Sequence, residues 1–331
     1  MVKHKEVKRN HHYVWSFYLK SWADNKELFY ISSKGKISKD SVKGLAKETD
    51  FYKINPLNSE DIEFIKRLSS KSSEFLQKLH LQHLEDFIKL SKISNKISNN
   101  ESEELQSIKK VIRYSSLENL HSIFENTAVT VVRELSKGNE KILNTDENMI
   151  AFCSYLGHQI SRTKSMKEKS LEAIKTQPIL NDDYERYISL WEKNWWFLSF
   201  MFGLNIGGSL YESRKRDNHI FITNNTDTPF ITSDTPIINV HSSLANLKQL
   251  EEPMYADFFI PLSPRYAYMI NQSDDYTHLK HSISIEEVNA LNMAIYKKSY
   301  KNVFSSESNV LKQLKAYNKS EEPIKNPRAA F

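Results

Sequence analysis

The chain of 331 residues has 26% charged and 39% hydrophobic residues and a net charge of +5, which is the composition of a globular protein with a sizeable core. Its 7 glycines form neither a GxGxxG nor a GxxxxGK[ST] motif, which argues against the common nucleotide-binding loops, and its single cysteine excludes an intramolecular disulfide. The start of the chain has no apolar signal segment, and the longest apolar stretch is far shorter than the roughly 20 residues of a membrane span, so we expect a cytoplasmic location and no membrane contact.

The first part of the chain combines a short helix with strands. His11 and His12 stand directly before apolar residues at helical spacing, 14–22, which predict a short buried helix. A neutral imidazole can act as an acid, a base or a metal ligand near pH 7, although adjacent histidines can equally be surface residues. The segment 27–38 predicts a β-hairpin with glycine in its turn, and 51–54 predicts a third short strand.

From Asn58 onward the pattern is helical for about 150 residues. Asn58 and the acids after it form an N-terminal cap signal. We expect a polar loop at 91–100 and a long helix over 105–135. His80 and His83 share a helix face, but no acid or third histidine completes a metal site at helical spacing, so we interpret them as surface residues.

A helix predicted over 147–173 carries a polar cluster. Gln159 and Arg162 share one side of this helix and border its apolar stripe. A guanidinium beside the core needs an anionic partner, either a carboxylate such as Asp234 or a bound phosphate. Cys153 lies on the apolar stripe and is predicted to be a core residue rather than a nucleophile.

The last third of the chain is mostly β. Apolar runs around the polar turn 224–228 predict one hairpin, and 258–270 predicts another with Arg265 beside its turn. Between the two hairpins, the sequence 232–236 places Asp234 at a strand kink. There it forms either a local turn or a rigidly held carboxylate that could serve as a metal ligand or catalytic acid.

This order of elements predicts an α+β fold, in which a long helical middle region packs on a mostly antiparallel sheet formed by N-terminal and C-terminal hairpins. We expect one domain over 1–317, with its helical part at about 58–215 and its β part at about 219–282, and a disordered tail over 318–331. The aromatic residues of 182–205 fit one helix face and predict core, with a base-stacking platform as the less favoured alternative.

The polar motifs occur in an order that resembles a bacterial family, the domain-of-unknown-function family 4238. The family pattern begins His-His-Tyr-Val-Pro-x-Phe-Tyr-Leu, and here Trp15 stands in place of the proline. The resemblance covers roughly residues 10–305. It implies no reaction, but it implies that the polar residues of its motifs form one recurring set: His11, His12, Gln159, Arg162, Asp234 and Arg265.

We therefore expect this set to converge on one pocket. The first hypothesis is a hydrolase that cleaves phosphodiester bonds in RNA or DNA, a nuclease that would suit a toxin or phage-defence effector. His11 or His12 would be the general acid or base. His12 and Asp234 are the candidate ligands of a divalent metal ion.

In the same hypothesis, Arg162 and Arg265 bind phosphate and stabilise developing charge, and Gln159 positions substrate or water. The mildly basic charge permits a nucleic-acid partner without demanding one. The alternative is a non-catalytic interaction protein, in which the same residues form a buried network that joins the helical and β parts. A third hypothesis is a metal-dependent hydrolase of a small phosphoester.

Overall fold

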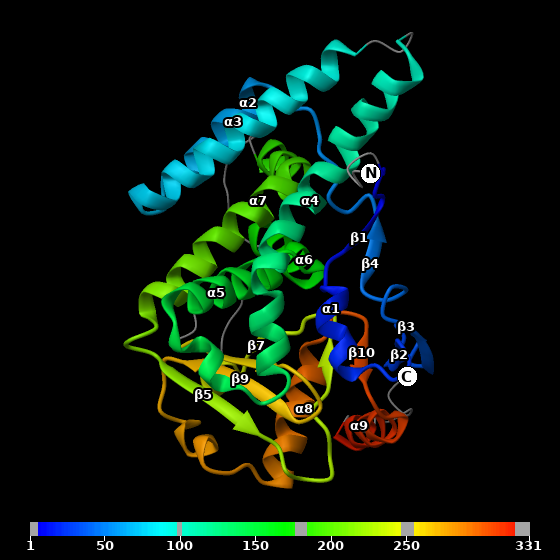
Figure 1. The fold of residues 1–331 in the computed structure, drawn as a ribbon, viewed down its shortest axis with the longest axis vertical. Coiled ribbons are helices and arrows are strands. Elements are labelled where there is room, and N and C mark those ends of the chain that lie inside the picture. The colour runs from blue at the N-terminus through cyan, green and yellow to red at the C-terminus, as the bar shows by residue number, and fades with distance from the viewer. Residues whose placement is uncertain (1–5, 98–100, 176–183, 246–254, 322–331) are drawn as a thin grey trace, which may run out of the picture.

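The computed structural model describes residues 6–97, 101–175, 184–245 and 255–321. Helices α2 to α7 make up one end of the molecule, and most of the strands lie at the other end with α8 and α9 (Figure 1). Within the described ranges, no helix combines the length and apolarity that a membrane span requires. The predicted α+β fold is confirmed.

The helical part follows the predicted middle region. Its elements are α2 (Ser59–Ser69), α3 (Glu74–Lys96), α4 (Glu103–Leu135), η3 (Glu140–Asn144), α5 (Asp146–Ser161), α6 (Lys164–Lys175) and α7 (Tyr184–Ser213). Asn58 caps α2 as predicted, because its side chain accepts the Asp61 amide while the Asp61 carboxylate accepts the Asn58 amide.

Two helix boundaries were predicted wrongly. The loop expected at 91–100 is helical as far as Lys96, and 98–100 lie outside the described residues. The single helix expected over 147–173 is two helices, because Thr163 interrupts it and its hydroxyl accepts the Met166 amide as the next helix begins.

The backbones of α5 and α7 approach each other so closely that positions 157 and 203 have no room for a side chain. A Cβ atom at Gly157 would lie 2.3 Å from the Gly203 carbonyl oxygen, and one at Gly203 would lie 2.3 Å from His158 Nδ1. Glycine at these positions therefore lets the two backbones approach and leaves room for a buried imidazole. The aromatic face of α7 is core as predicted, with Trp195, Trp196 and Phe197 buried.

The strands form antiparallel sheets in the described residues. One pairs β1 (Asn10–His12) with β4 (Lys47–Thr49). The second has the order β3 (Ile37–Ser41), β2 (Glu27–Ile31), β10 (Val303–Ser305), β6 (Thr232–Ser233). The third has the order β5 (Asn218–Thr223), β9 (Tyr266–Asn271), β8 (Asp257–Pro261), β7 (Ile238–Asn239). The remaining elements are α1 (Ser16–Leu19), η2 (Lys20–Trp22), η4 (Ser242–Ala245), η5 (Thr277–Lys280), α8 (Ile285–Lys298) and α9 (Ser308–Glu321).

The hairpins predicted at 27–38 and 258–270 are confirmed, and they lie in the second and third sheets. The prediction of a strand at 51–54 is wrong. The strand in this region is β4, which ends at Thr49. The hairpin predicted around 224–228 is also wrong, because β5 pairs with β9 while β6 pairs with β10. The predicted tail is helical in its first residues, since α9 reaches Glu321, and its remainder lies outside the described residues.

The segment after the two histidines joins the helical and β parts. The Tyr18 hydroxyl donates to the Pro261 carbonyl at 2.7 Å and lies 2.8 Å from the Thr232 hydroxyl. The Trp22 indole donates to the Phe230 carbonyl at 2.8 Å. Because both side chains are buried, these bonds anchor α1 and η2 to the β part.

The interpretation of His80 as a surface residue is wrong. Its side chain is fully buried, and its Nδ1 lies 3.1 Å from the Ser69 hydroxyl. Burial lowers the pKa of His80 to about 4, so it is neutral at pH 7 and packs as a core side chain.

Candidate functional site

Arg162 is a deeply buried charge of the predicted set. It forms the C-cap of α5, and its guanidinium group is only 2% exposed. Nη2 donates to Glu125 Oε1 on α4 at 2.6 Å and to Gln159 Oε1 at 3.2 Å. Burial lowers the pKa of Arg162, but the Glu125 carboxylate raises it. The net effect is a raised pKa. The anionic partner expected from the sequence is therefore Glu125, not Asp234.

Gln159 fixes the chain between β1 and α1. Its Nε2 donates to the Tyr13 carbonyl at 2.9 Å, and its Oε1 accepts the Trp15 amide at 3.2 Å. These two hydrogen bonds hold the backbone that follows His12 against the end of α5. The predicted motif residues His12, Gln159 and Arg162 are thereby brought together.

His12 is half-buried, and its Nε2 atom is buried without a hydrogen-bond partner in the described part of the chain. Burial lowers the pKa of His12, a hydrogen bond to the Lys43 backbone raises it, and the charges of Lys47 and Arg162 lower it further. Since Nε2 is unpartnered, the bond to the Lys43 carbonyl comes from Nδ1–H. The Nε2 lone pair of this neutral ring is thus free to accept a proton.

Glu118 lies with His12 and Arg162, although it was not among the residues predicted from the sequence. Its Oε2 atom is buried and has no hydrogen-bond partner among the described residues. Burial raises the pKa of Glu118 to about 7, against the charge of Arg162, which lowers it. We name His12, Glu118, Glu125, Gln159 and Arg162 the Arg162 cluster. It unites β1, α4 and α5, and its signal in the sequence is the spacing of Glu118 and Glu125, which places both carboxylates on one face of α4.

Two further imidazoles lie close to the cluster. His121 and His158 are buried, their ring centroids are 5.6 Å apart, and none of their nitrogens has a partner among the described residues. Burial, reinforced by the charge of Arg162, lowers the pKa of His158 to about 3. Both rings are therefore neutral, and they extend the polar interior beyond the residues that the sequence singled out.

His11 points away from this cluster and is held by backbone groups. Its Nε2 lies 2.7 Å from the Tyr114 carbonyl and 2.9 Å from the Lys8 carbonyl, and its Nδ1 accepts the Tyr52 amide at 2.7 Å. With both nitrogens engaged, His11 joins the start of the chain to α4 and to the segment after β4.

Asp234 also binds backbone. Its Oδ1 accepts the Tyr300 amide at 2.8 Å, and its Oδ2 accepts the amides of Lys301 and Asn302 at 2.7 and 2.8 Å. Burial raises the pKa of Asp234 against these bonds, which lower it. Burial and the charge of Asp234 raise the pKa of the Tyr13 side chain, and the Tyr13 carbonyl accepts a hydrogen bond from Gln159. Tyr13 therefore lies between Asp234 and the cluster.

Arg265 lies apart from the cluster. Its Nη1 donates to the carbonyls of Thr226 and Asn224 at 2.6 and 3.3 Å, which holds the turn after β5 against the β8–β9 turn. The structure therefore does not bring Arg265 to His12.

The prediction that His12 and Asp234 bind one metal ion gains no support from the cluster of ligand atoms found in the described residues. Both Asp234 oxygens are engaged by amides. In the described part of the chain, the group of three acidic or imidazole side chains with ligand atoms within 4.8 Å of one another comprises His241, Asp257 and Asp275. That group includes neither His12 nor Asp234.

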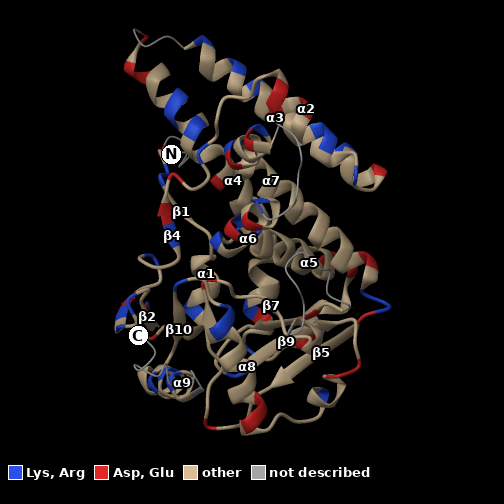
Figure 2. Cartoon of the chain, turned by 180° about the vertical axis from the view of Figure 1, so that it is seen from behind, with Lys and Arg blue, Asp and Glu red and all other residues tan. Residues whose placement is uncertain are grey.

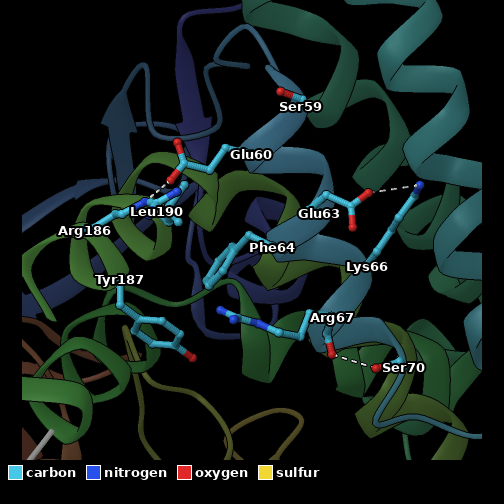
Figure 3. Close-up of a pocket in the computed structure, with 10 residues that line it drawn as sticks. All are labelled: Ser59, Glu60, Glu63, Phe64, Lys66, Arg67, Ser70, Arg186, Tyr187 and Leu190. Atoms are coloured by element: carbon cyan, nitrogen blue, oxygen red, sulfur yellow. Dashed lines mark hydrogen bonds and ion pairs between the residues drawn. The ribbon is translucent and has the colours of Figure 1, made fainter. Parts of the chain in front are cut away.

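A cleft of about 900 Å³ lies between α2 and α7 (Figure 3). In it, the Arg67 guanidinium lies 5.8 Å from the Phe64 ring centroid and 5.9 Å from that of Tyr187. Glu60 pairs with Arg186 at its edge (Figure 3). None of the predicted site residues lines this cleft, and its chemistry is that of surface ion pairs around an aromatic floor, so we place the candidate site at the Arg162 cluster.

Comparison with known proteins gives one match. A family model described as a protein of unknown function (DUF4238) matches residues 10–190 and 201–309. No curated protein and no solved structure matches the chain.

Proposed function

The chain belongs to the DUF4238 family, and because the description of that family names no activity, we propose a function from the Arg162 cluster: a hydrolase that cleaves phosphodiester bonds. The observation that carries this proposal is the pair of unpartnered atoms Glu118 Oε2 and His12 Nε2 close to the charge of Arg162. Buried polar atoms without partners are rare in folded proteins and concentrate where chemistry is performed.

The two groups suit complementary proton transfers. His12 is a neutral imidazole with a free Nε2 lone pair, so it takes the proton of the attacking water or hydroxyl as the new P–O bond forms. Glu118 has a pKa of about 7, so at neutral pH a large share of the carboxyl groups is protonated and can donate to the leaving oxygen as the old P–O bond breaks. Arg162 supplies a fixed positive charge, and Gln159 holds the segment that carries His12.

A substrate would reach Glu118 past the segment that contains Lys8. The Lys8 amide donates to the Ser115 hydroxyl at 2.9 Å, and Lys8 Nζ donates to Asn119 Oδ1 at 2.8 Å. These two partners flank Glu118 on α4. Displacement of this short segment would uncover the carboxyl group and free the Lys8 ammonium for a phosphate.

A nucleic acid is the proposed substrate because a lysine lies near each of the two proposed catalytic groups. Lys8 acts electrostatically on Glu118, and Lys47 acts on His12. Elsewhere, both basic and acidic residues occur along α3 and α4 (Figure 2), so the local cations carry this argument. A cytoplasmic nuclease of this kind would act as a toxin or defence effector, which growth of cells expressing the chain would test.

The test is cleavage of labelled RNA and DNA by the purified chain and its variants. We expect His12→Ala and Glu118→Gln each to lower the rate by about 100-fold or more in protein that remains folded. The matched control is Glu103→Gln, an exposed carboxylate at the start of the same helix, which should keep full activity. Cleavage of free nucleotides but not of polymers would favour a small-phosphoester hydrolase instead.

A second candidate, a non-catalytic interaction protein, is favoured by a different observation. His11, Gln159 and Asp234 each bind backbone groups of distant segments, as a structural network would. In that case, no nucleic acid or phosphoester is cleaved. His12→Ala and Glu118→Gln would then change stability alone, so cleavage by the unmodified chain, or its absence, separates the two functions.

A further inference from the structure

A second cluster of ionisable side chains lies at the end of the third sheet, outside the Arg162 cluster. His241 follows β7, Asp257 begins β8, and Asp275 follows β9, and one ligand atom from each lies within 4.8 Å of the others. We propose that these three side chains bind a divalent metal ion of the manganese or zinc type. This proposal is independent of the proposed hydrolase.

The backbone of the site is organised before any ion binds. The Asn239 side-chain carbonyl accepts the amides of both His241 and Asp257, each at 3.0 Å. The Val240 amide donates to the Asp257 carbonyl at 2.8 Å. One asparagine oxygen therefore fixes the relative positions of two proposed ligands, as supporting residues do in metal sites.

The two carboxylates differ in exposure and in support. Asp257 is fully buried, and it accepts the Ser273 amide at 3.1 Å and the Ser273 hydroxyl at 2.6 Å. It forms no ion pair with a lysine or arginine in the described ranges, although a buried carboxylate needs a nearby positive charge or strong hydrogen bonds. Asp275 is 57% exposed, which leaves one side of the site open to water ligands.

The imidazole directs a nitrogen into the site. His241 is only 8% exposed, and its Nε2 lies 3.7 Å from Asp275 Oδ2. Its Nδ1 lies 2.7 Å from the Ser243 hydroxyl and 3.2 Å from the Ser243 amide. Because the Ser243 amide can only donate, Nδ1 is an acceptor and the ring proton lies on Nε2, so a metal ion that binds Nε2 displaces this proton.

The composition of the site selects the class of ion. The two carboxylates offer negative charge that a divalent cation balances, and the imidazole offers a nitrogen ligand. Carboxylates accept both hard and borderline cations, whereas an imidazole ligand favours transition metals over magnesium or calcium. The bound ion would tie together the ends of β7, β8 and β9.

The experiment titrates chelator-treated full-length protein with MnCl₂ and with ZnCl₂ in a calorimeter, and follows the melting temperature in parallel. We expect one-site binding of at least one ion and a rise of the melting temperature by several degrees. His241→Ala and Asp275→Asn should weaken binding by about tenfold or more and remove that rise. Asp275 is exposed, so its variant keeps the test valid if the histidine variant fails to fold.

The matched control is Asp274→Asn, because Asp274 is the neighbour of Asp275 but accepts the Asn218 side-chain amide at 2.8 Å and does not belong to the group. Its variant should bind the ion like the unmodified chain. Flat titrations of the unmodified chain with both ions would overturn the proposal, and so would an Asp275→Asn variant that binds as tightly as the control. Neither result bears on the hydrolase, whose test needs only cleavage assays.

Discussion

Glu118 offers the sharpest test of the electrostatics of the Arg162 cluster. Burial raises its pKa from the ordinary 4.5 to about 7, a difference that corresponds to about 3.4 kcal/mol when the group is fully ionised. Because the side chain is half-buried, solvent screening reduces the expected effect to about 2–3 kcal/mol. A carboxyl group whose folded-state pKa is raised contributes stability below pH 4.5, and that contribution is lost as the pH rises through 7.

The variant Glu118→Gln does not titrate at this position. Its free energy of unfolding, measured against the unmodified chain, should therefore increase by about 2–3 kcal/mol between pH 4 and pH 8. Urea denaturation followed by tryptophan fluorescence at successive pH values measures this difference, and the other titrating groups largely cancel between the two proteins. A difference that stays flat over this range would refute the reasoning.

Glu125→Gln is the matched variant, since both carboxylates lie on the same face of α4. Glu125 pairs with Arg162 at 2.6 Å, so its removal leaves a buried guanidinium without a carboxylate. We expect a loss of about 3–5 kcal/mol in stability at pH 7. The two substitutions should thus act in opposite directions at neutral pH, although each exchanges a glutamate for a glutamine.

Three further outcomes follow from single contacts. As the pH falls from 8 to 5, the free energy of unfolding of His158→Phe should rise by about 2 kcal/mol relative to that of the unmodified chain, as measured by urea denaturation. The reason is that a histidine with a folded pKa of about 3 loses its stabilising contribution as the pH falls below 6.5. Gly157→Ala should cost several kcal/mol or prevent soluble expression, since the new methyl group would lie 2.3 Å from the Gly203 carbonyl oxygen. Arg265→Ala should lower stability by about 1 kcal/mol in thermal melts and leave any cleavage activity unchanged, because its guanidinium binds the carbonyls of a turn.

Local signals in the sequence were sufficient for elements that depend on local interactions. The N-terminal cap at Asn58 was readable because Asn58 and its partner Asp61 lie within one helical turn. The pairing of β6 with β10 joins residues that are far apart in the chain, and no turn signal specifies it. The predicted hairpin around 224–228 failed for this reason, since alternation identifies a strand but not its partner.

The candidate site shows the same limit at the level of side chains. Polar motifs at Gln159 and Arg162 could be singled out because a helix places them together beside the core. Their partner Glu125 could not, because a glutamate on a long amphipathic helix is normally a solvated residue. Glu118 was missed for the same reason, and its pKa is raised by burial that only the folded chain creates.

The distribution of contacts separates two roles within the recurring motifs. His11, Asp234 and Arg265 use their polar atoms on backbone groups, and this leaves them little capacity for a substrate. Of these three, His11 holds the segment around His12 against α4 through the Tyr114 carbonyl. Glu118 Oε2 and His12 Nε2 have no such partner, and in the proposed hydrolase these two groups transfer the protons. A site of this type depends on its clamps for geometry and on its unpartnered atoms for chemistry, so loss of a clamp should reduce stability first and loss of an unpartnered group should reduce activity first.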